Sequence, residues 1–266
     1  DESRALLISS EALTLVELGN GLEVKRIPPY GFKRDKKYAA RYGEGSYMGC
    51  AFSPDGKFIY YGSANQGQVK VFDIEKNDIA GTIDINGGRY RDSFLGDFVL
   101  SADGRTLYAV DQFNYRMVTV DLSKRKVVQS VRVGRNPFGI RLSPDARYAW
   151  VSNVGMFEYP LIPGVTPNNR RSAGLSFPAY GVPSKEAEEG VAVEGKFIPG
   201  LGSPNHPDAM SVFEVNLRTG KVERKIKTGY LVGVQRDDLT TIGGASPSSI
   251  AVGRKHIYVS NATNDN

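Results

Sequence analysis

The sequence predicts an all-β fold of short antiparallel strands, because one tight turn recurs along the chain between alternating apolar residues. The turn reads Ser-Pro-Asp-Gly or a close variant at residues 53–56, 101–104 and 143–146. Proline presets the backbone at the second turn position, and Asp and Gly suit the positions that follow. Apolar and polar residues alternate on both sides of each turn, which indicates half-buried strands.

The spacing of the repeat predicts that these strands form a β-propeller. The equivalent aromatic residues Tyr60, Tyr108 and Trp150 are separated by 48 and 42 positions, and a degenerate copy follows at Tyr258. Four short antiparallel strands at such a period are the pattern of a propeller blade. A β-sandwich is the alternative, but it does not explain a turn that recurs at one phase.

The elements can be assigned in order along the chain. Three strands come first, and three blades of four strands follow, each with the turn in its first hairpin and a polar turn in its second. The expected strands and hairpins cover residues 6–9, 13–18 and 22–27, then 51–61 with 69–85, 100–110 with 117–133, 142–151 with 211–227, and finally 250–261. We therefore expect a single propeller domain over residues 1–266, incomplete at both ends, with about four and a quarter blades of a ring of about seven.

Long connections are expected on one face of this propeller. If the strands of a blade are called a to d from the axis outward, the a–b and c–d turns share one face and are short. The b–c and d–a connections share the other face, and the long ones are residues 28–47, 86–94, 154–209 and 229–246. Long loops in a compact domain are usually functional or disordered. We predict that this face binds partners, and that the b–c insert at 154–209 is an ordered excursion over the propeller or against another subunit.

The chemistry of these connections favours other protein subunits or domains as partners. Basic residues interleaved with aromatic ones also occur in nucleic-acid interfaces, but a net charge of +5 is low for that use, and we expect no nucleic acid. Aromatic and arginine side chains are enriched where proteins meet. The predicted partner-binding residues are Tyr30, Phe32, Arg34, Lys37, Arg41, Arg89, Arg91, Arg135, Phe157, Tyr159, Arg170, Arg171, Phe177 and Tyr180.

No residue is assigned a catalytic role, and no cofactor is expected. One cysteine and two histidines exclude an internal disulfide, an iron–sulfur cluster and a cysteine-based zinc site. The nucleophile-elbow, Walker A and His-Glu-x-x-His motifs are missing from the sequence. His206 beside Asp208 is a weak candidate pair for a metal, and a histidine within a turn is the favoured interpretation.

Two further expectations concern the membrane and the central channel. No apolar run approaches the ~20 residues that a membrane-spanning helix needs, so we expect no membrane span. The d–a connections lead into the inner strands and should surround the mouth of the channel, where a small ligand could bind. Arg91, Asp92, Asp97 and Arg135 are the candidates for its polar lining.

The repeat also resembles a known family. Residues 133–153, VGRNPFGIRLSPDARYAWVSN, and Tyr-Val-Ser-Asn at 258–261 are similar to the YVTN repeat of YncE-like β-propellers. This resemblance implies an extracytoplasmic location, in the periplasm or an equivalent lumen, with a signal peptide outside this sequence. The insert resembles those in the propeller half of bifunctional YncE/alkaline-phosphatase-like proteins, and the beta subunit of hydrazine synthase looks similar.

Three functions stay open at this point. The first is a non-catalytic scaffold or interaction subunit of an extracytoplasmic complex. The second is a subunit of a multi-subunit redox enzyme, such as hydrazine synthase, that shapes access to a cofactor on a partner chain. The third is the propeller half of a bifunctional phosphoesterase.

Overall fold

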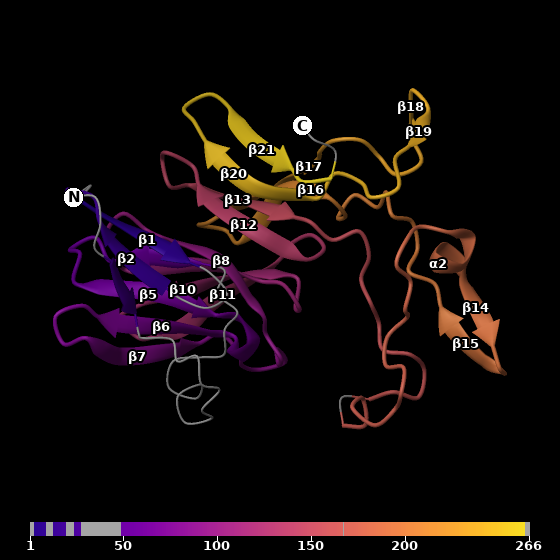
Figure 1. Cartoon of the computed structure of the whole chain (residues 1–266), viewed down its shortest axis with the longest axis horizontal. Helices are drawn as coiled ribbons and strands as arrows, with labels where there is room; N and C mark the ends of the chain where they lie inside the picture. The colour runs from indigo at the N-terminus through magenta and orange to yellow at the C-terminus, as the bar shows by residue number, and fades with distance from the viewer. Residues whose placement is uncertain (1–2, 9–12, 20–23, 28–48, 167, 264–266) are drawn as a thin grey trace.

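The strands form antiparallel sheets in the order that the repeat predicts (Figure 1). The computed structural model describes residues 3–8, 13–19, 24–27, 49–166 and 168–263. We call the sheets blades 1 to 5. Blade 1 contains β1 (Arg4–Ile8), β2 (Leu13–Glu17) and β3 (Val24–Ile27), and blade 5 contains β20 (Pro247–Val252) and β21 (Ile257–Asn261).

The three blades between them have four strands each, with the innermost strand first. Blade 2 contains β4 (Cys50–Phe52), β5 (Phe58–Ser63), β6 (Gln68–Asp73) and β7 (Asp78–Asp84), and a short 3-10 turn η1 (Ala64–Gln66) follows β5. Blade 3 contains β8 (Leu95–Leu100), β9 (Thr106–Asp111), β10 (Arg116–Asp121) and β11 (Lys126–Arg132). Blade 4 contains β12 (Pro137–Leu142), β13 (Tyr148–Asn153), β16 (Ser211–Asn216) and β17 (Lys221–Lys227). The predicted all-β propeller architecture is confirmed.

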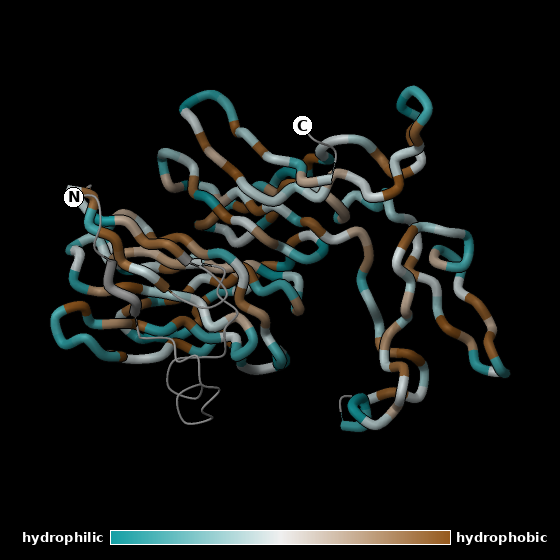
Figure 2. Tube along the Cα trace, in the orientation of Figure 1, coloured by the Kyte–Doolittle hydropathy of each residue, from teal (hydrophilic) through white to brown (hydrophobic). Residues whose placement is uncertain are grey.

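The hydrophobic core lies between adjacent blades. Val69 and Ile83 of blade 2 pack with Leu107 of blade 3, and Met117 of blade 3 packs with Phe213 of blade 4. Figure 2 shows hydrophobic positions along the strands and hydrophilic residues at the turns. Each strand buries side chains against its neighbouring blades, as the period-two pattern requires. Rows of side chains between blades therefore hold the sheets together.

The recurring turn is held by a serine and an aspartate in every copy. The Ser143 hydroxyl donates to Asp145 Oδ1 at 2.6 Å and accepts the Tyr148 N–H at 3.0 Å. The same bonds recur around Ser53 and Ser101. Hydrogen bonds from Ser143 and then from Arg147 lower the pKa of Asp145 to about 2. The residues that made the motif visible in the sequence are the ones that close the turn.

Replacing Ser143 by alanine is expected to raise the pKa of Asp145 from about 2 toward 3.8. The folded-state pKa lies below the ordinary value, so the turn's contribution to stability is complete above pH 3.8 and is lost as pH falls toward 2. A carbon-13 NMR titration of the Asp145 carboxyl measures the change. Arg147→Gln should produce a smaller rise, and a larger one would show that the ion pair dominates.

Two connections contain secondary structure that the sequence did not predict. The insert holds the helix α2 (Lys185–Glu189) and the hairpin of β14 (Gly190–Val193) and β15 (Lys196–Pro199). A second small hairpin pairs β18 (Gln235–Arg236) with β19 (Leu239–Thr240). In Figure 1, α2 and the β14–β15 hairpin lie beside the blades, away from their strands. Among the helices that the structure describes, none is long and apolar enough to cross a membrane.

Candidate interaction surface

The described long connections lie together on one face of the propeller. Asp92, in the d–a loop at 86–94, forms an ion pair with Arg170 of the insert at 3.0 Å. Asn205, near the end of the insert, exchanges two hydrogen bonds of 2.9 Å with the backbone of Val232 in the d–a loop at 229–246. The insert thus contacts both d–a loops. We call the face formed by these three connections the long-loop face.

The fourth predicted connection, residues 28–47, lies outside the described residues. Five predicted partner-binding residues fall there. They are Tyr30, Phe32, Arg34, Lys37 and Arg41.

The insert is fastened to the propeller at its base by Arg135. The Arg135 guanidinium donates to the carbonyl of Met156 at 2.5 Å and to that of Ser203 at 3.4 Å. Its backbone N–H donates to the carbonyl of Asp208. One residue of the short connection between β11 and β12 therefore holds both ends of the insert. Arg135 is only 8% exposed, so it does not reach a partner as predicted and instead positions the insert.

Lys227, at the end of β17, reinforces the same base. Its ammonium donates to the carbonyls of His206, at 3.1 Å, and of Ala209. Burial, together with repulsion from Arg135 and opposed by Asp208, lowers the pKa of Lys227 to about 8.

The charge state of Lys227 predicts a pH dependence. The pKa in the folded chain lies below the ordinary 10.5, so the unfolded chain binds more protons between these values and stability rises from about pH 8 to about pH 10.5. NMR of methylated lysines, with the signal assigned by its loss in Lys227→Arg, should give a pKa near 8. Asp208→Asn should lower it further. A titration near 10.5 would contradict the expectation.

The candidate metal pair occupies a turn within this base. His206 Nδ1 accepts the backbone N–H of Asp208 at 3.1 Å, and the Asp208 carboxylate pairs with Lys225 at 2.7 Å. Within the described part of the chain, no group of three or more His, Cys, Asp or Glu side chains is placed to hold a metal ion. His206 and Asp208 thus both have partners within or beside this turn.

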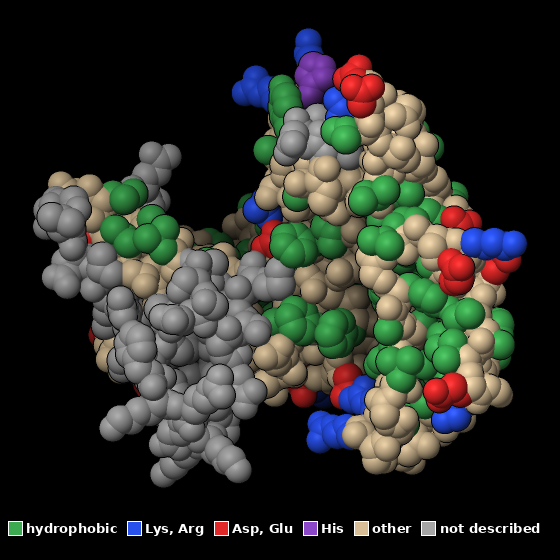
Figure 3. Space-filling model, turned by 45° about the vertical axis from the view of Figure 1, so that its right-hand side comes forward, with side chains coloured by type: hydrophobic (Ala, Val, Ile, Leu, Met, Phe, Trp, Pro, Cys, Tyr) green, Lys and Arg blue, Asp and Glu red, His purple; other side chains and the backbone are tan. Residues whose placement is uncertain are grey.

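Exposed hydrophobic side chains concentrate on the long-loop face. Phe113, on the b–c connection of blade 3, is 64% exposed and stacks on Phe94. The insert and the loop at 229–246 together expose Tyr159, Leu175, Phe177, Val182, Val193, Phe197, Tyr230, Leu231, Val234, Leu239 and Ile242. Figure 3, which turns the insert forward, shows hydrophobic patches across this side of the molecule. Extended apolar surface of this kind marks contact sites.

The predicted insert residues divide between this surface and the interior. Tyr159 and Phe177 are exposed, and Arg171 is exposed beside Arg170. Tyr180 is half-buried. Phe157 is 5% exposed and packs edge-on against Tyr159. The prediction that Phe157 contacts a partner is therefore corrected, because the side chain is covered by its own chain.

Of the four residues predicted to line the channel mouth, Asp97 lies among the inner strands. Inner strands β8, β12 and β20 are neighbours, and the Ser152 hydroxyl donates to the carbonyl of Ser248 at 2.6 Å. Asp97 pairs with Arg141 at 2.5 Å. Burial raises the pKa of Asp97, and the nearby Arg141 opposes this rise. Of the other three candidates, Asp92 pairs with Arg170 of the insert, Arg135 lies beneath the insert, and Arg91 is exposed.

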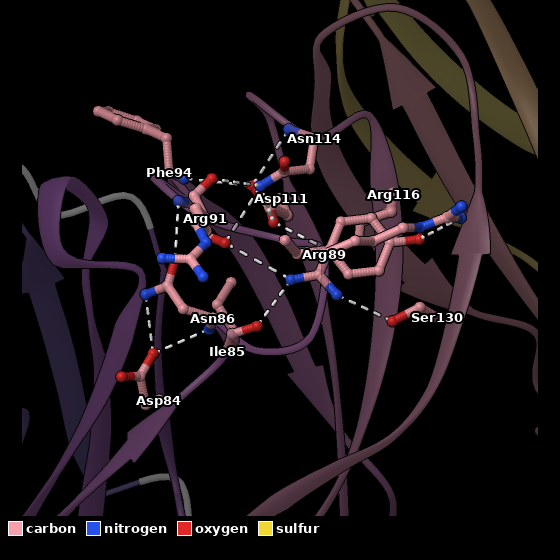
Figure 4. A network of polar contacts seen from close by, with 12 residues as sticks. Asp84, Ile85, Asn86, Arg89, Arg91, Phe94, Asp111, Asn114, Arg116 and Ser130 are labelled. Carbon is pink, nitrogen blue, oxygen red and sulfur yellow. Dashed lines mark hydrogen bonds and ion pairs between the residues drawn. The ribbon is translucent and has the colours of Figure 1, made fainter. Parts of the chain in front are cut away.

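A buried ion pair that the sequence analysis missed lies beneath the loop at 86–94 (Figure 4). Arg116 Nε donates to Asp111 Oδ2 at 2.9 Å, and the two residues are 2% and 0% exposed. Asp111 also accepts the Phe94 N–H and the Asn114 side chain. The Tyr90 ring lies 3.7 Å from the Arg116 guanidinium carbon. Arg89, a predicted partner residue, donates to the Tyr90 hydroxyl from the solvent side.

A sequence signal for this pair existed in the repeat itself. Asp111 occupies the last position of strand b, where the equivalent residues are Ser63, Asn153 and Asn261. An acidic residue at a position otherwise neutral predicts a basic partner, because an unpaired buried carboxylate is costly.

Comparison with known proteins shows limited similarity. No protein-family model matches the chain. Antigen Lp49 of Leptospira interrogans serogroup Icterohaemorrhagiae serovar copenhageni (strain Fiocruz L1-130) is 25% identical over 153 residues, which are 55% of this chain and 29% of the antigen. The match thus spans less than a third of that relative's length.

Solved structures are similar in fold. A functionally unknown protein from Desulfotomaculum acetoxidans DSM 771 superposes with a TM-score of 0.51 and 14% identity, covering 97% of this chain and 59% of that one. The WD40 repeats of RRP9 superpose with a TM-score of 0.44 and 10% identity, covering 70% of this chain and 40% of that one. Kuenenia stuttgartiensis hydrazine synthase superposes with a TM-score of 0.37 and 19% identity, covering 68% of this chain and 48% of that one. At these identities the likeness concerns the fold alone.

Proposed function

We propose that this chain is a non-catalytic interaction propeller of an extracytoplasmic protein or complex, and that its long-loop face binds a protein partner. The observation that carries the proposal is the apolar surface of the insert. The described part of residues 154–209 buries few side chains, yet it exposes Leu175, Phe177, Val193 and Phe197. Ordering such a segment costs conformational entropy, and exposed apolar groups do not offset that cost. A partner that covers these groups would offset it.

The geometry of the base supports the same role. Arg135 and Lys227 fix where the insert leaves and rejoins the propeller. Preorganised surfaces bind with a smaller loss of conformational entropy. The rigid blades thus present a surface whose position is set before a partner arrives.

The extracytoplasmic location rests on the resemblance of the repeat to YVTN repeats. The partial similarity to a protein named as an antigen is in keeping with it. Protease treatment of intact cells that carry the tagged full-length protein tests the location. Digestion only after the outer envelope is opened is expected, and resistance until the cytoplasmic membrane is broken would contradict it.

Native purification with mass spectrometry of the accompanying chains tests the function. A double variant, Phe177→Ser with Phe197→Ser, should weaken retention of the partner at least about tenfold, as expected for buried aromatic anchors. The matched control, Val128→Ser with Ile226→Ser, removes exposed apolar groups from the outer strands β11 and β17 and should leave retention unchanged. Equal loss in both variants would contradict the assignment of the face.

The identity of the partner distinguishes the finer alternatives. A haem-bearing partner would favour the redox-enzyme subunit, and a phosphoesterase domain in the same polypeptide would favour the bifunctional chain. Partners without a cofactor or hydrolase domain would favour the scaffold.

A further inference from the structure

A cleft of about 630 Å³ opens between the outer strands of blades 2 and 3. Thr82 and Asp84 of β7 form one wall, and Lys126 and Ser130 of β11 form the other. The loop at 85–90 closes one end, where Gly87 and Tyr90 exchange two backbone hydrogen bonds of 3.0 Å. The volume is that of a small-molecule site.

The cleft carries a surplus of positive charge. Four cationic side chains line it: Arg89, Arg116, Arg125 and Lys126. Asp84 is the acidic residue among the described lining. Asp111, which does not line the cleft, pairs with Arg116. Two positive charges are therefore left uncompensated, which favours an anion in the cleft.

At the back of this cleft, blade 3 has residues that differ in type from those at the equivalent positions of blades 2 and 4. The last residue of strand b faces the first residue of strand c as Ser63 with Gln68 in blade 2, and as Asn153 with Ser211 in blade 4. In blade 3 the same positions hold the ion pair of Asp111 and Arg116. A buried ion pair is seldom the most stable choice for such a position.

The ion pair connects the two blades that form the walls. Arg116 Nη2 donates to the carbonyl of Ile85, from the blade 2 side, at 2.6 Å, and Nη1 donates to Ser130 of β11 at 2.9 Å. The Tyr90 ring covers the same guanidinium. Arg116 thus fixes the end loop and the outer strand at a set separation, which preorganises the cleft.

Blade 3 differs from the other blades at a second position, Arg125, in the c–d turn beside the cleft. The equivalent residues of blades 2 and 4 are Asn77 and Gly220, with φ of 55° and 65°. Arg125 has the same left-handed backbone, with φ of 52°. Asn and Gly adopt this conformation readily, but a long side chain does so at a cost. Strain of this kind concentrates at functional sites.

The side chain of Arg125 lies across the neighbouring blade. Its Nη1 donates to the carbonyl of Ala80 at 3.4 Å, and a Cβ added to Gly81 would lie 2.1 Å from the same nitrogen. Gly81 therefore leaves the space that the guanidinium occupies at the edge of the cleft.

We propose that this cleft binds a small organic anion, with Arg125 and Lys126 holding its oxyanion group and Arg116 fixing the back wall. Guanidinium groups pair with carboxylate and phosphate oxygens through parallel hydrogen bonds. The Ser130 hydroxyl and the loop at 85–90 add polar groups for the rest of the ligand. This site lies between β7 and β11 and shares only the loop at 85–90 with the long-loop face.

Nitrogen-15 NMR titration of the purified chain tests the proposal, with sodium phosphate in one arm and sodium malonate in the other. Ionic strength is held constant with sodium chloride. Saturable shifts are expected at the amides of Gly87, Gly88 and Ser130 in at least one arm, and the arm that responds identifies phosphate or carboxylate. The double variant Arg125→Gln with Lys126→Gln should weaken binding at least about tenfold.

Lys124→Gln is the matched control, because Lys124 belongs to the same turn but pairs with Asp121 and does not line the cleft. It should leave both titrations unchanged. Amide shifts outside the cleft should be preserved in the double variant, which shows that the blades stay folded. Failure of both probes to give saturable shifts, or equal weakening by Lys124→Gln, would overturn the proposal.

Discussion

Replacing Arg116 with methionine is expected to lower the free energy of unfolding by about 3–5 kcal/mol. The substitution leaves the Asp111 carboxylate fully buried without its cation, and it removes donors to Ile85 and Ser130. An uncompensated buried charge is among the few causes of so large an effect. Urea denaturation followed by circular dichroism measures the change.

Two variants check the cause of that loss. Arg105→Met removes an exposed arginine from the a–b turn of the same blade and should cost no more than about 0.5 kcal/mol. Adding Asp111→Asn to Arg116→Met should recover part of the stability, because the buried charge is then gone. If Arg116→Met stays within about 1 kcal/mol of the unchanged chain, the ion pair does not hold blades 2 and 3 together.

Replacing Arg135 with methionine is expected to release the insert while the blades stay folded. The variant loses a charged hydrogen bond to Met156, worth about 1.5–3 kcal/mol, and a longer, weaker one to Ser203. Amide hydrogen exchange across residues 156–208 should accelerate by roughly 10- to 100-fold, because local opening then costs less free energy.

The neighbouring ion pair provides the control for this experiment. Arg132 pairs with Glu158 of the insert, but both side chains are partly exposed, so the pair contributes only about 0–1 kcal/mol. Arg132→Met should change exchange in the insert by less than about fivefold. Equal acceleration in both variants would show that the base of the insert does not depend on Arg135. Acceleration throughout the blades would show that the insert and propeller unfold together.

The fold could be predicted from the sequence because its turns and strands are coded locally. Ser143 and Asp145 close a turn within six residues, and the outer strand β11 alternates exposed and covered positions along its length. Local patterns of this kind repeat in each blade, so that every copy supports the assignment of the others.

The insert could be located but its structure could not be predicted. Phe157 and Tyr159 lie two positions apart in an irregular segment, and one is covered while the other is exposed. No periodic pattern of apolar residues in the sequence distinguishes the two, since the contacts that bury Phe157 are tertiary. Arg135 was predicted on an exposed face for its charge alone, whereas its burial depends on Met156 and Ser203, far along the chain. The ion pair of Asp111 and Arg116 was also missed, although the departure of Asp111 from the other copies of the repeat could have indicated it.

The central claim is that the long-loop face, and not the face of the short turns, binds a protein partner. Hydrogen-exchange protection of the chain, free and in complex with its co-purified partner, tests it most directly. The account predicts slower exchange in the complex at residues 154–209 and 229–246, with unchanged exchange at the turns 53–58, 101–106 and 143–148. Protection confined to those turns would contradict it.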